Sequence, residues 1–239
     1  MLAEITQLLD LQTTDGQLYE LAIQIDRLRH QQAQTEERIA AEEANVDRLR
    51  AQLAELEHES RMKNLAVDEL DANIRQYQER LDKGIISFKE MEDLRAKIDS
   101  ERGRISTMED EALGLMDTIE HSRRELGQAI SDCTVKVAEA RSQIDDIVNR
   151  VSAIETEIDR LEGERETLAE RTPPYLLKQY ESLHQRSSEP VAVIKNGTCS
   201  GCKLKLSGST IERVRGGMGI VTCEHCSRIL YVDDFVTND

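Results

Sequence analysis

Hydrophobic side chains recur at alternating steps of three and four residues through the first third of the chain. From Leu18 to Leu81 this series has 19 positions, and 14 of them are apolar. A spacing of 3.5 residues keeps one stripe of a helix facing a partner helix, and a stripe this long is typical of a coiled coil. The pattern therefore predicts one long helix with a continuous seam.

A second series with the same spacing runs from Met91 to Leu161. It continues through Leu126, Ile130 and Cys133, where two successive steps of four residues interrupt the alternation. Such an interruption is a stutter, which relaxes a left-handed supercoil locally. The series predicts a second long helix that lies against the first and changes register near Ile130.

The segment between the two series, residues 82–87, carries signals for the end of one helix and the start of another. Gly84 can adopt the left-handed conformation that ends a helix. Ser87 and Glu90 have the spacing of a capping box, in which each side chain bonds to the backbone of the other residue. We therefore expect a tight turn here.

The two predicted helices, residues 2–82 and 87–170, are nearly equal in length. Folding at the turn would lay one seam along the other, which favours an intramolecular antiparallel hairpin. The alternative is a parallel intermolecular coiled coil with a kink at Gly84, and a dimer of hairpins also stays open. The equal arms and the turn residues favour the hairpin.

Charge and composition divide the chain near Thr172. Residues 1–171 have 40 acidic and 23 basic side chains, a net charge of −17, whereas residues 172–239 have 7 and 8, a net charge of +1. All three prolines lie in the second part. We predict a coiled-coil domain at 1–171, a linker helix at 172–190 and a small domain at 191–239.

The linker has its own helical pattern. Thr172 is placed to cap a short helix, with Pro173 in its first turn. Apolar and aromatic residues follow at helical spacing up to Leu183, and we expect them to pack the small domain against the base of the hairpin. Because an even hairpin returns residue 170 to the side of residue 2, the small domain should lie near the start of the first helix.

Four cysteines in two CxxC pairs carry the most specific chemistry. Two residues between cysteines allow both thiolates of a pair to bind one ion from a tight turn, and two such pairs complete a tetrahedral shell. We predict one structural Zn²⁺ bound by Cys199, Cys202, Cys223 and Cys226. Since thiolates would fill all four positions, no position is left for water or substrate, and a catalytic zinc is not expected.

Other uses of these cysteines fit less well. A thioredoxin-like redox pair needs a βαβ context, which is absent from the pattern. A disulfide framework needs an oxidising compartment, and an iron–sulfur cluster fits the paired spacing less well than zinc. His225 lies between two of the cysteines and could replace one of them, but four thiolates are the simpler set.

The zinc should also stabilise the fold of this region. The segment has short strand-like apolar runs, at 191–194, 220–221 and 229–232, but it is too small for a self-sufficient core. Metal binding would supply the missing stability, so that metal removal should unfold this domain and leave the coil intact. These features predict a mainly α protein in which a long antiparallel coiled-coil hairpin precedes a small β zinc ribbon.

Basic residues lie around the cysteine pairs and form a candidate nucleic-acid-binding surface. They are Lys203, Lys205, Arg213, Arg215 and Arg228. They could contact phosphates of RNA or DNA, or they could be ordinary solvated surface, and the sequence weighs the two readings equally. The acidity of the coil does not decide the matter, because charges are screened over about 8 Å at physiological salt.

Several functional classes are disfavoured. The chain has no apolar run of transmembrane length, and its first residues do not resemble a secretory signal, so we expect a cytoplasmic protein. We found no phosphate-binding glycine loop and no nucleophile with a neighbouring base, so neither an enzyme nor a small-molecule substrate is expected.

The order of a helical hairpin, a linker with Tyr180 and a CxGC…CxxC ribbon resembles the bacterial C4-type zinc-ribbon family. Further shared residues are Arg228 to Tyr231, and Lys89-Glu90 resembles the family's Lys-Glu at the hairpin turn. Ser227 departs from the glycine that the family usually has after the last cysteine. The resemblance implies zinc binding by the four cysteines and a nucleic-acid-binding or regulatory role, which in some flagellated relatives involves RNA and a sigma factor.

Two functions from different classes follow. The first is a nucleic-acid-binding regulator that uses the basic surface of the ribbon. The second is a protein–protein adaptor or chaperone-like tether, for example of a transcription factor, that acts through the coiled coil. The sequence does not identify the partner, the nucleic acid or the oligomeric state.

Overall fold

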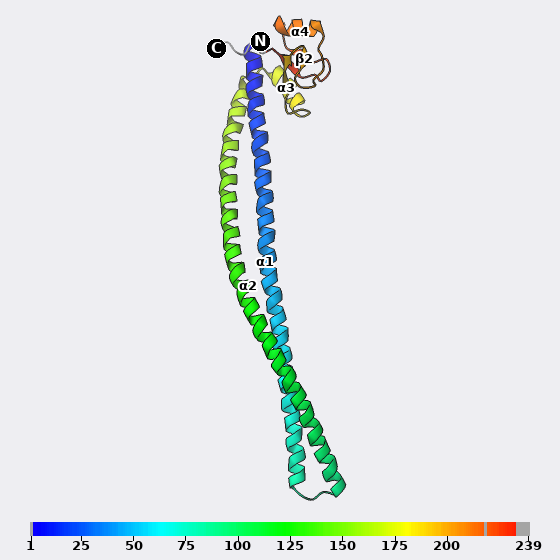
Figure 1. The fold of residues 1–239 in the computed structure, drawn as a ribbon. Helices are drawn as coiled ribbons and strands as arrows, with labels where there is room; N and C mark the ends of the chain where they lie inside the picture. The colour runs from blue at the N-terminus through cyan, green and yellow to red at the C-terminus, as the bar shows by residue number, and fades with distance from the viewer. Residues whose placement is uncertain (1, 218, 233–239) are drawn as a thin grey trace. The chain divides into compact units, whose positions relative to one another are not determined.

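The computed structural model describes residues 2–217 and 219–232, so that the last seven residues of the expected ribbon domain lie outside the described part. Two long helices, α1 (Leu2–Asp82) and α2 (Phe88–Arg171), precede the short helix α3 (Pro174–His184) (Figure 1). The rest of the described chain contains four strands and one helix. They are β1 (Val191–Lys195), β2 (Thr198–Cys199), α4 (Gly208–Arg215), β3 (Val221–Thr222) and β4 (Ile229–Tyr231).

The chain divides into two compact units. The first unit contains the residues up to Gln32 together with those from Asp145 onward, and the second unit is Ala33–Ile144. No helix in the described residues is long and apolar enough to cross a membrane. The first unit holds α3 and all four strands, and the second unit holds the turn of the hairpin.

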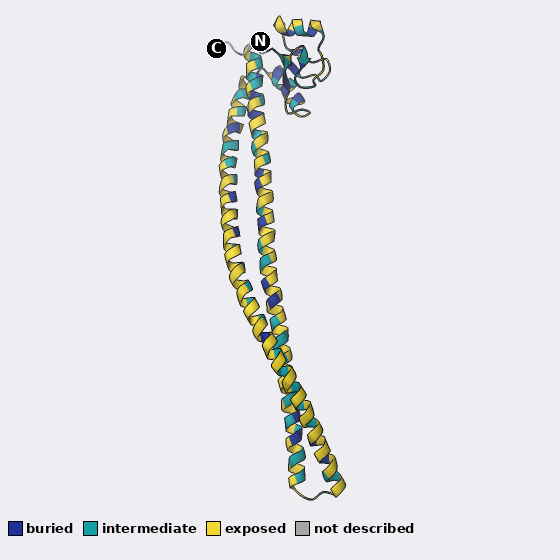
Figure 2. Ribbon diagram, in the orientation of Figure 1, coloured by how far each residue is buried: buried dark blue, intermediate teal, exposed yellow. Residues whose placement is uncertain are grey.

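The two long helices form the antiparallel hairpin that the sequence predicts, and its seam is apolar. In both units, the buried residues lie on the sides of α1 and α2 that face each other (Figure 2). Buried aliphatic residues of the two predicted series are Ile25, Leu28, Val46, Leu49, Leu70, Ile74, Leu94, Ile98, Ile119, Ala140, Ile147 and Leu161. The heptad pattern therefore identified the contact face correctly.

Polar residues within the seam set the register of the second unit. Lys63 donates to Glu111 at 2.7 Å, and Lys136 donates to Glu42 at the same distance. Each pair joins one helix to the other, and each contains a polar residue of the first series, Lys63 or Glu42. A shift of either helix along the other would separate both pairs.

The predicted seam is off by one residue at Ile130, and the stutter starts seven residues later than predicted. Ile130 is 38% exposed, and Ala129 is the half-buried residue that takes its place on the seam. The burial pattern then continues through Cys133, Val137 and Ala140, so the two successive steps of four residues start at Ala129 and not at Ser122. The hydrophobic pattern selected Ile130 because its side chain is large and apolar, but the smaller Ala129 beside it is the residue that faces the seam.

The ribbon is a four-stranded sheet with the order β2-β1-β4-β3, in which β1 and β4 are parallel and the other pairs are antiparallel. Successive residues of a strand point to opposite faces. Ala192 and Leu230 lie in one hydrophobic cluster with two of the cysteines, whereas Val191 and Ile229 lie in a second cluster with residues of α1 and α3. The sheet therefore joins the cysteine site on one face to the base of the hairpin on the other.

Two local elements of the ribbon have clear sequence causes. Asn196 and Gly197 both have positive φ, 51° and 73°, and join β1 to β2 in the two-residue turn that an Asn-Gly pair favours. Ser207 caps α4, since its hydroxyl accepts a hydrogen bond from the backbone N–H of Thr210 at 3.3 Å. Sequence analysis did not predict α4, which inserts between the two cysteine pairs.

Candidate metal centre and its surroundings

The two cysteine pairs lie in loops of equivalent backbone geometry. In the first loop, the N–H of Lys203 donates to the carbonyl oxygen of Cys199 at 2.9 Å. In the second loop, the N–H of Ser227 donates to the carbonyl oxygen of Cys223, also at 2.9 Å. Both donors have left-handed conformations, with φ of 64° and 62°. Ser227, which stands where the family usually has glycine, therefore adopts a backbone conformation that favours glycine.

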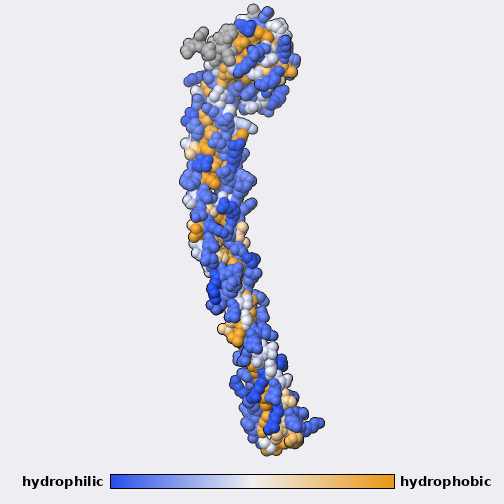
Figure 3. Space-filling view, in the orientation of Figure 1, coloured by the Kyte–Doolittle hydropathy of each residue, from blue (hydrophilic) through white to orange (hydrophobic). Residues whose placement is uncertain are grey.

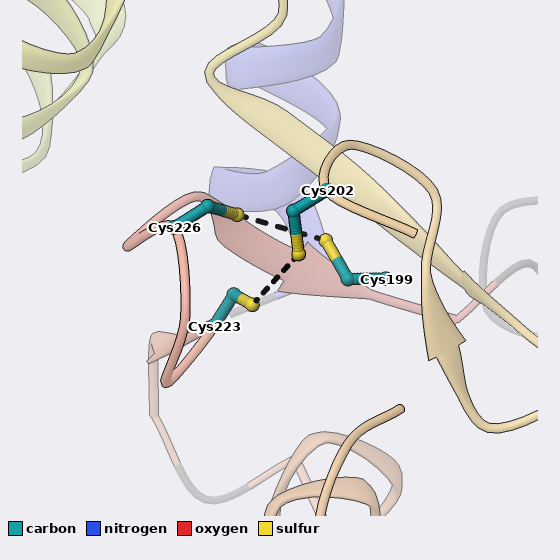
Figure 4. Close-up of side chains that lie close together, drawn as sticks. All are labelled: Cys199, Cys202, Cys223 and Cys226. Carbon is teal, nitrogen blue, oxygen red and sulfur yellow. Dashed lines mark hydrogen bonds between the residues drawn. The ribbon is translucent and has the colours of Figure 1, made fainter. Parts of the chain in front are cut away.

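The four sulfur atoms gather at one point between the two loops (Figure 4). All of them lie within 4.8 Å of one another, and the pairs Cys199–Cys226 and Cys202–Cys223 are each separated by 3.8 Å. A tetrahedron of sulfurs at about 2.3 Å from a zinc ion has edges of about 3.8 Å. The cluster is thus consistent with one structural Zn²⁺, as the sequence predicts.

Burial and hydrogen bonding act differently on the individual thiols. Burial raises the pKa of Cys223 to about 12, and it also raises the pKa of Cys199. At Cys226, burial opposes ionisation, but hydrogen bonds from the backbone and side chain of Arg228 and from the thiols of Cys223 and Cys202 together outweigh it and lower the pKa to about 7. Binding of zinc to the cluster must therefore displace protons from the more deeply buried thiols.

His225 does not belong to the sulfur cluster. Its side chain is exposed, and its Nε2 lies 3.2 Å from the carbonyl oxygen of Lys205 on the other loop. The backbone N–H of Ser207 also donates to a carboxylate oxygen of Glu224, at 2.8 Å. These contacts fasten the second cysteine loop to the segment that precedes α4, so His225 has a structural partner away from the cysteines.

Arg228 is a structural residue of the site. Its Nε donates to the carbonyl oxygen of Glu189 at 2.8 Å, and its Nη2 donates to Ser187 Oγ at 2.5 Å. Its side chain also passes so close to Gly201 that a Cβ there would lie 2.5 Å from Cδ of the arginine. The glycine of the CxGC motif is therefore required by the packing of Arg228, which ties the ribbon to the end of the linker.

The other four candidate nucleic-acid-binding residues are exposed. Lys203 and Lys205 lie in the first cysteine loop, and Arg213 and Arg215 lie in the last turn of α4. α4 contacts β3 and β4, which flank the second cysteine loop. Leu204, between the two lysines, is 50% exposed. The basic residues thus divide into four on the surface and one, Arg228, that has internal partners.

A buried carboxylate at the base of the hairpin joins three helices, and sequence analysis missed it. Asp15 of α1 is 5% exposed. It accepts a hydrogen bond from Arg165 of α2 at 2.5 Å and one from the hydroxyl of Tyr180 of α3 at 2.7 Å. Burial and this bond to Asp15 raise the pKa of Tyr180, and the bond to Asp15 raises the pKa of Arg165.

Next to this carboxylate, α1 contacts the ribbon directly. The side-chain oxygen of Gln12 accepts a hydrogen bond from the backbone N–H of Val191 at 2.7 Å. Leu8 and Leu11, both fully buried, pack in the hydrophobic cluster that includes Tyr180 and Ile229. The expectation that the linker packs the ribbon against the start of the first helix is confirmed.

The start of α3 differs from the prediction. Thr172 does not cap this helix. Its hydroxyl donates back to the carbonyl oxygen of Leu168 at 2.8 Å, and its N–H donates to the carbonyl oxygen of Ala169. The N-cap position belongs to Pro173, which makes no side-chain cap bond. Thr172 therefore completes the last turn of α2, and Pro174 begins α3.

Comparisons with known proteins agree with both parts of the structure. The model of the CT398-like coiled coil hairpin domain matches residues 7–188, and that of the C4-type zinc ribbon domain matches residues 198–230. No curated protein matches the chain.

Three solved structures have a similar fold over nearly their whole length. CT398 from Chlamydia trachomatis is 22% identical, with a TM-score of 0.85 over 97% of this chain and 99% of that one. HP0958 from Helicobacter pylori is 20% identical, with a TM-score of 0.56 over 97% and 98%. A structure from Mycobacterium smegmatis is 18% identical, with a TM-score of 0.63 over 96% and 98%. At these identities the likeness concerns the fold alone.

Proposed function

The chain belongs to the family with the CT398-like coiled coil hairpin domain, and from this premise we propose that it is a regulator that binds RNA or DNA through its zinc ribbon. The combination of a coiled coil and a zinc ribbon fits a non-enzymatic protein. The observation that supports nucleic-acid binding is that Lys203, Lys205, Arg213 and Arg215 are all exposed on the ribbon, which also contains the cysteine cluster. In this proposal, the four cysteines are the zinc ligands.

The proposed contacts are electrostatic. Cationic side chains that neutralise phosphates release counterions, so the logarithm of affinity falls with the logarithm of salt by about 0.7 per phosphate contacted on a single strand. Tyr231 is the one Phe, Tyr or Trp among the described residues of the ribbon, so base stacking should contribute little and the binding should have weak sequence preference. Arg228 contributes by fixing the ribbon on the linker and not by phosphate contact.

A salt titration of RNA binding by the full chain tests this proposal. Replacing the four exposed basic residues with Ala should weaken binding by at least tenfold and flatten the salt dependence, because each lost phosphate contact reduces the slope by up to about 1. Replacing Arg95, Arg104, Arg141 and Arg150 of α2 changes the net charge equally and serves as the control. Equal binding by the two variants would contradict the proposal.

The proposal places the protein in the cytoplasm, because free thiols that bind zinc persist in a reducing compartment.

The proposal also retains the domain division at 1–171, 172–190 and 191–239. Limited proteolysis of the zinc-loaded chain would test the division. The division predicts first cuts at the exposed end of the linker, within residues 185–189, and first cuts inside α1, α2 or the ribbon would contradict it.

A second role, as a protein adaptor or chaperone-like tether that acts through the coil, is favoured by hydrophobic residues on the outer faces of the hairpin. Leu65, Leu113 and Met116 are 59%, 62% and 59% exposed. Chemical crosslinking of the full chain in cells should then join a dominant protein partner to the hairpin. Crosslinks confined to the ribbon would contradict this role.

A further inference from the structure

The turn of the hairpin presents the two most exposed large hydrophobic side chains of the described chain. Ile85 is 93% exposed and Phe88 is 73% exposed, whereas the other exposed large hydrophobic residues range from 38% to 63%. Hydrophobic surface is visible at the turn, at the bottom of the space-filling view (Figure 3). Neither side chain is needed for the seam, which is filled on either side of the turn by Leu70, Ile74 and Leu94.

Other residues hold the backbone of this turn in place. Gly84 has a φ of 68°, and its N–H donates to the carbonyl oxygen of Leu81 at 3.3 Å. The hydroxyl of Ser87 accepts from the N–H of Glu90 at 3.2 Å, and the carboxylate of Glu90 pairs with Arg80 at 2.8 Å. The turn can therefore keep its conformation when the two apolar side chains are changed.

Residues 83–89 at the turn have a net charge of +2, opposite in sign to that of the hairpin, and Asp82 and Glu90 are the acidic residues that directly flank them. Lys83 and Lys89 are exposed on either side of the apolar residues, and no acidic residue lies between them. The nearest following carboxylate, Glu90, is engaged by Arg80. Residues 1–171 have a net charge of −17, so this positive, apolar turn is an exception on an acidic hairpin.

We propose that residues 83–89 form a docking surface for a partner protein, which receives Ile85 and Phe88 in an apolar recess with an acidic rim. An anionic membrane would attract the same lysines. However, a membrane is a broad surface that would also face Asp82, Glu92 and Asp93, which are all exposed. A recess contacts only the apex of the turn, so the charges favour a protein. This inference does not depend on nucleic-acid binding by the ribbon.

The size of the surface predicts a transient contact. Two apolar side chains and two lysines cover far less area than a stable interface requires, so the complex should form and dissociate rapidly. Within such a contact, the buried apolar residues carry most of the affinity and the lysines mainly accelerate association. Removal of the two apolar side chains should therefore weaken binding about 100-fold or more.

The first step of the test is photocrosslinking of the full chain in the cells that encode it. A photoreactive amino acid replaces Phe88, and in a second chain it replaces Val135, which is 56% exposed on α2 and serves as the control. The proposal predicts a protein that is crosslinked from position 88 and not from position 135. No crosslinked protein, or equal crosslinking from both positions, would overturn it.

The second step measures binding of that purified protein to the full chain. We expect Ile85→Ser with Phe88→Ser to weaken binding about 100-fold, and Lys83→Glu with Lys89→Glu to weaken it at least tenfold at low salt. Val135→Ser with Val148→Ser, at two other exposed apolar positions of α2, should change it less than twofold. Unchanged binding by the turn variants would overturn the proposal, as would Phe88-dependent flotation of the chain with phosphatidylglycerol vesicles. Retained RNA affinity in the turn variants separates this result from the function of the ribbon.

Discussion

The hairpin and the ribbon bury their hydrophobic residues in different ways. Along α1 and α2, similar aliphatic residues repeat at each turn of the seam, so that no single residue is decisive. In the ribbon, one cluster contains Cys199 and Cys223 themselves, and the opposite face of the sheet depends on Tyr180 and the start of α1. Stability is therefore distributed along the seam of the hairpin, whereas the ribbon depends on two points, the cysteine cluster within it and the base of the hairpin around Asp15 and Tyr180.

The largest effect should come from the first of these points, the cysteine cluster. Cys223→Ser should abolish stoichiometric zinc and unfold the ribbon, because the core of this small domain includes the ligands. The helical circular dichroism of the hairpin should remain near its original value. Metal analysis and circular dichroism check this result, with Cys133→Ser on the seam as the control, which should retain zinc. A zinc-loaded Cys223→Ser chain would contradict the comparison.

The second point is the buried carboxylate. Asp15→Ala should destabilise the first unit by about 3 kcal/mol, because it leaves the Tyr180 hydroxyl and the Arg165 guanidinium without their acceptor. Asp15→Asn retains an acceptor and should cost less. Denaturant unfolding measures both, and an equal or smaller loss than that of Tyr180→Phe, about 1 kcal/mol, would show that the carboxylate is not central.

A smaller effect should arise where Arg228 crosses Gly201. Gly201→Ala forces the arginine side chain away and should cost about 1–2 kcal/mol of ribbon stability through lost hydrogen bonds to the linker. Gly208→Ala, whose new Cβ would meet nothing within 4 Å, is the matched control. Zinc retention in a chelator titration gives the readout. Similar retention by the two variants would mean that Arg228 adapts without cost.

The smallest effect should be a gain in the hairpin. Gly114 lies inside α2, and a Cβ there would meet nothing within 4 Å, so Gly114→Ala should stabilise the helix by about 0.5–1 kcal/mol. Gly84→Ala should destabilise the hairpin, because alanine is strained at a φ of 68°. Thermal unfolding followed by circular dichroism distinguishes these opposite signs, and a loss at Gly114 would indicate a contact at that position.

The sequence predicts features that repeat or have fixed spacing. The heptad series located the seam because each buried Leu, Ile or Val adds to one period, and the two CxxC pairs located the metal centre. Asp15 escaped notice because a polar residue breaks the apolar series, and its partners Arg165 and Tyr180 are distant in sequence. Ile130 was misplaced because hydrophobicity does not reveal which neighbour, Ala129 or Ile130, faces the partner helix.

The ribbon illustrates a further limit of sequence analysis. α4 begins with a capping serine that the sequence contains, but its eight residues are too few for periodicity to indicate a helix. Arg228 looks like any basic surface residue until its contacts with Glu189 and Ser187 are seen. Such contacts decide whether a basic side chain is free to bind nucleic acid, and they cannot be inferred from the residue type.

Hydrogen exchange with and without a chelator tests most directly the claim that the ribbon needs the metal to stay folded, whereas the hairpin is folded without it. The zinc-loaded chain should contain one zinc ion and protect the backbone amides of β1, β4 and the cysteine loops. After chelation, protection should disappear between residues 191 and 232 and persist along the seam between residues 33 and 144. A ribbon that stays protected without metal, or a hairpin that loses protection with it, would contradict the account.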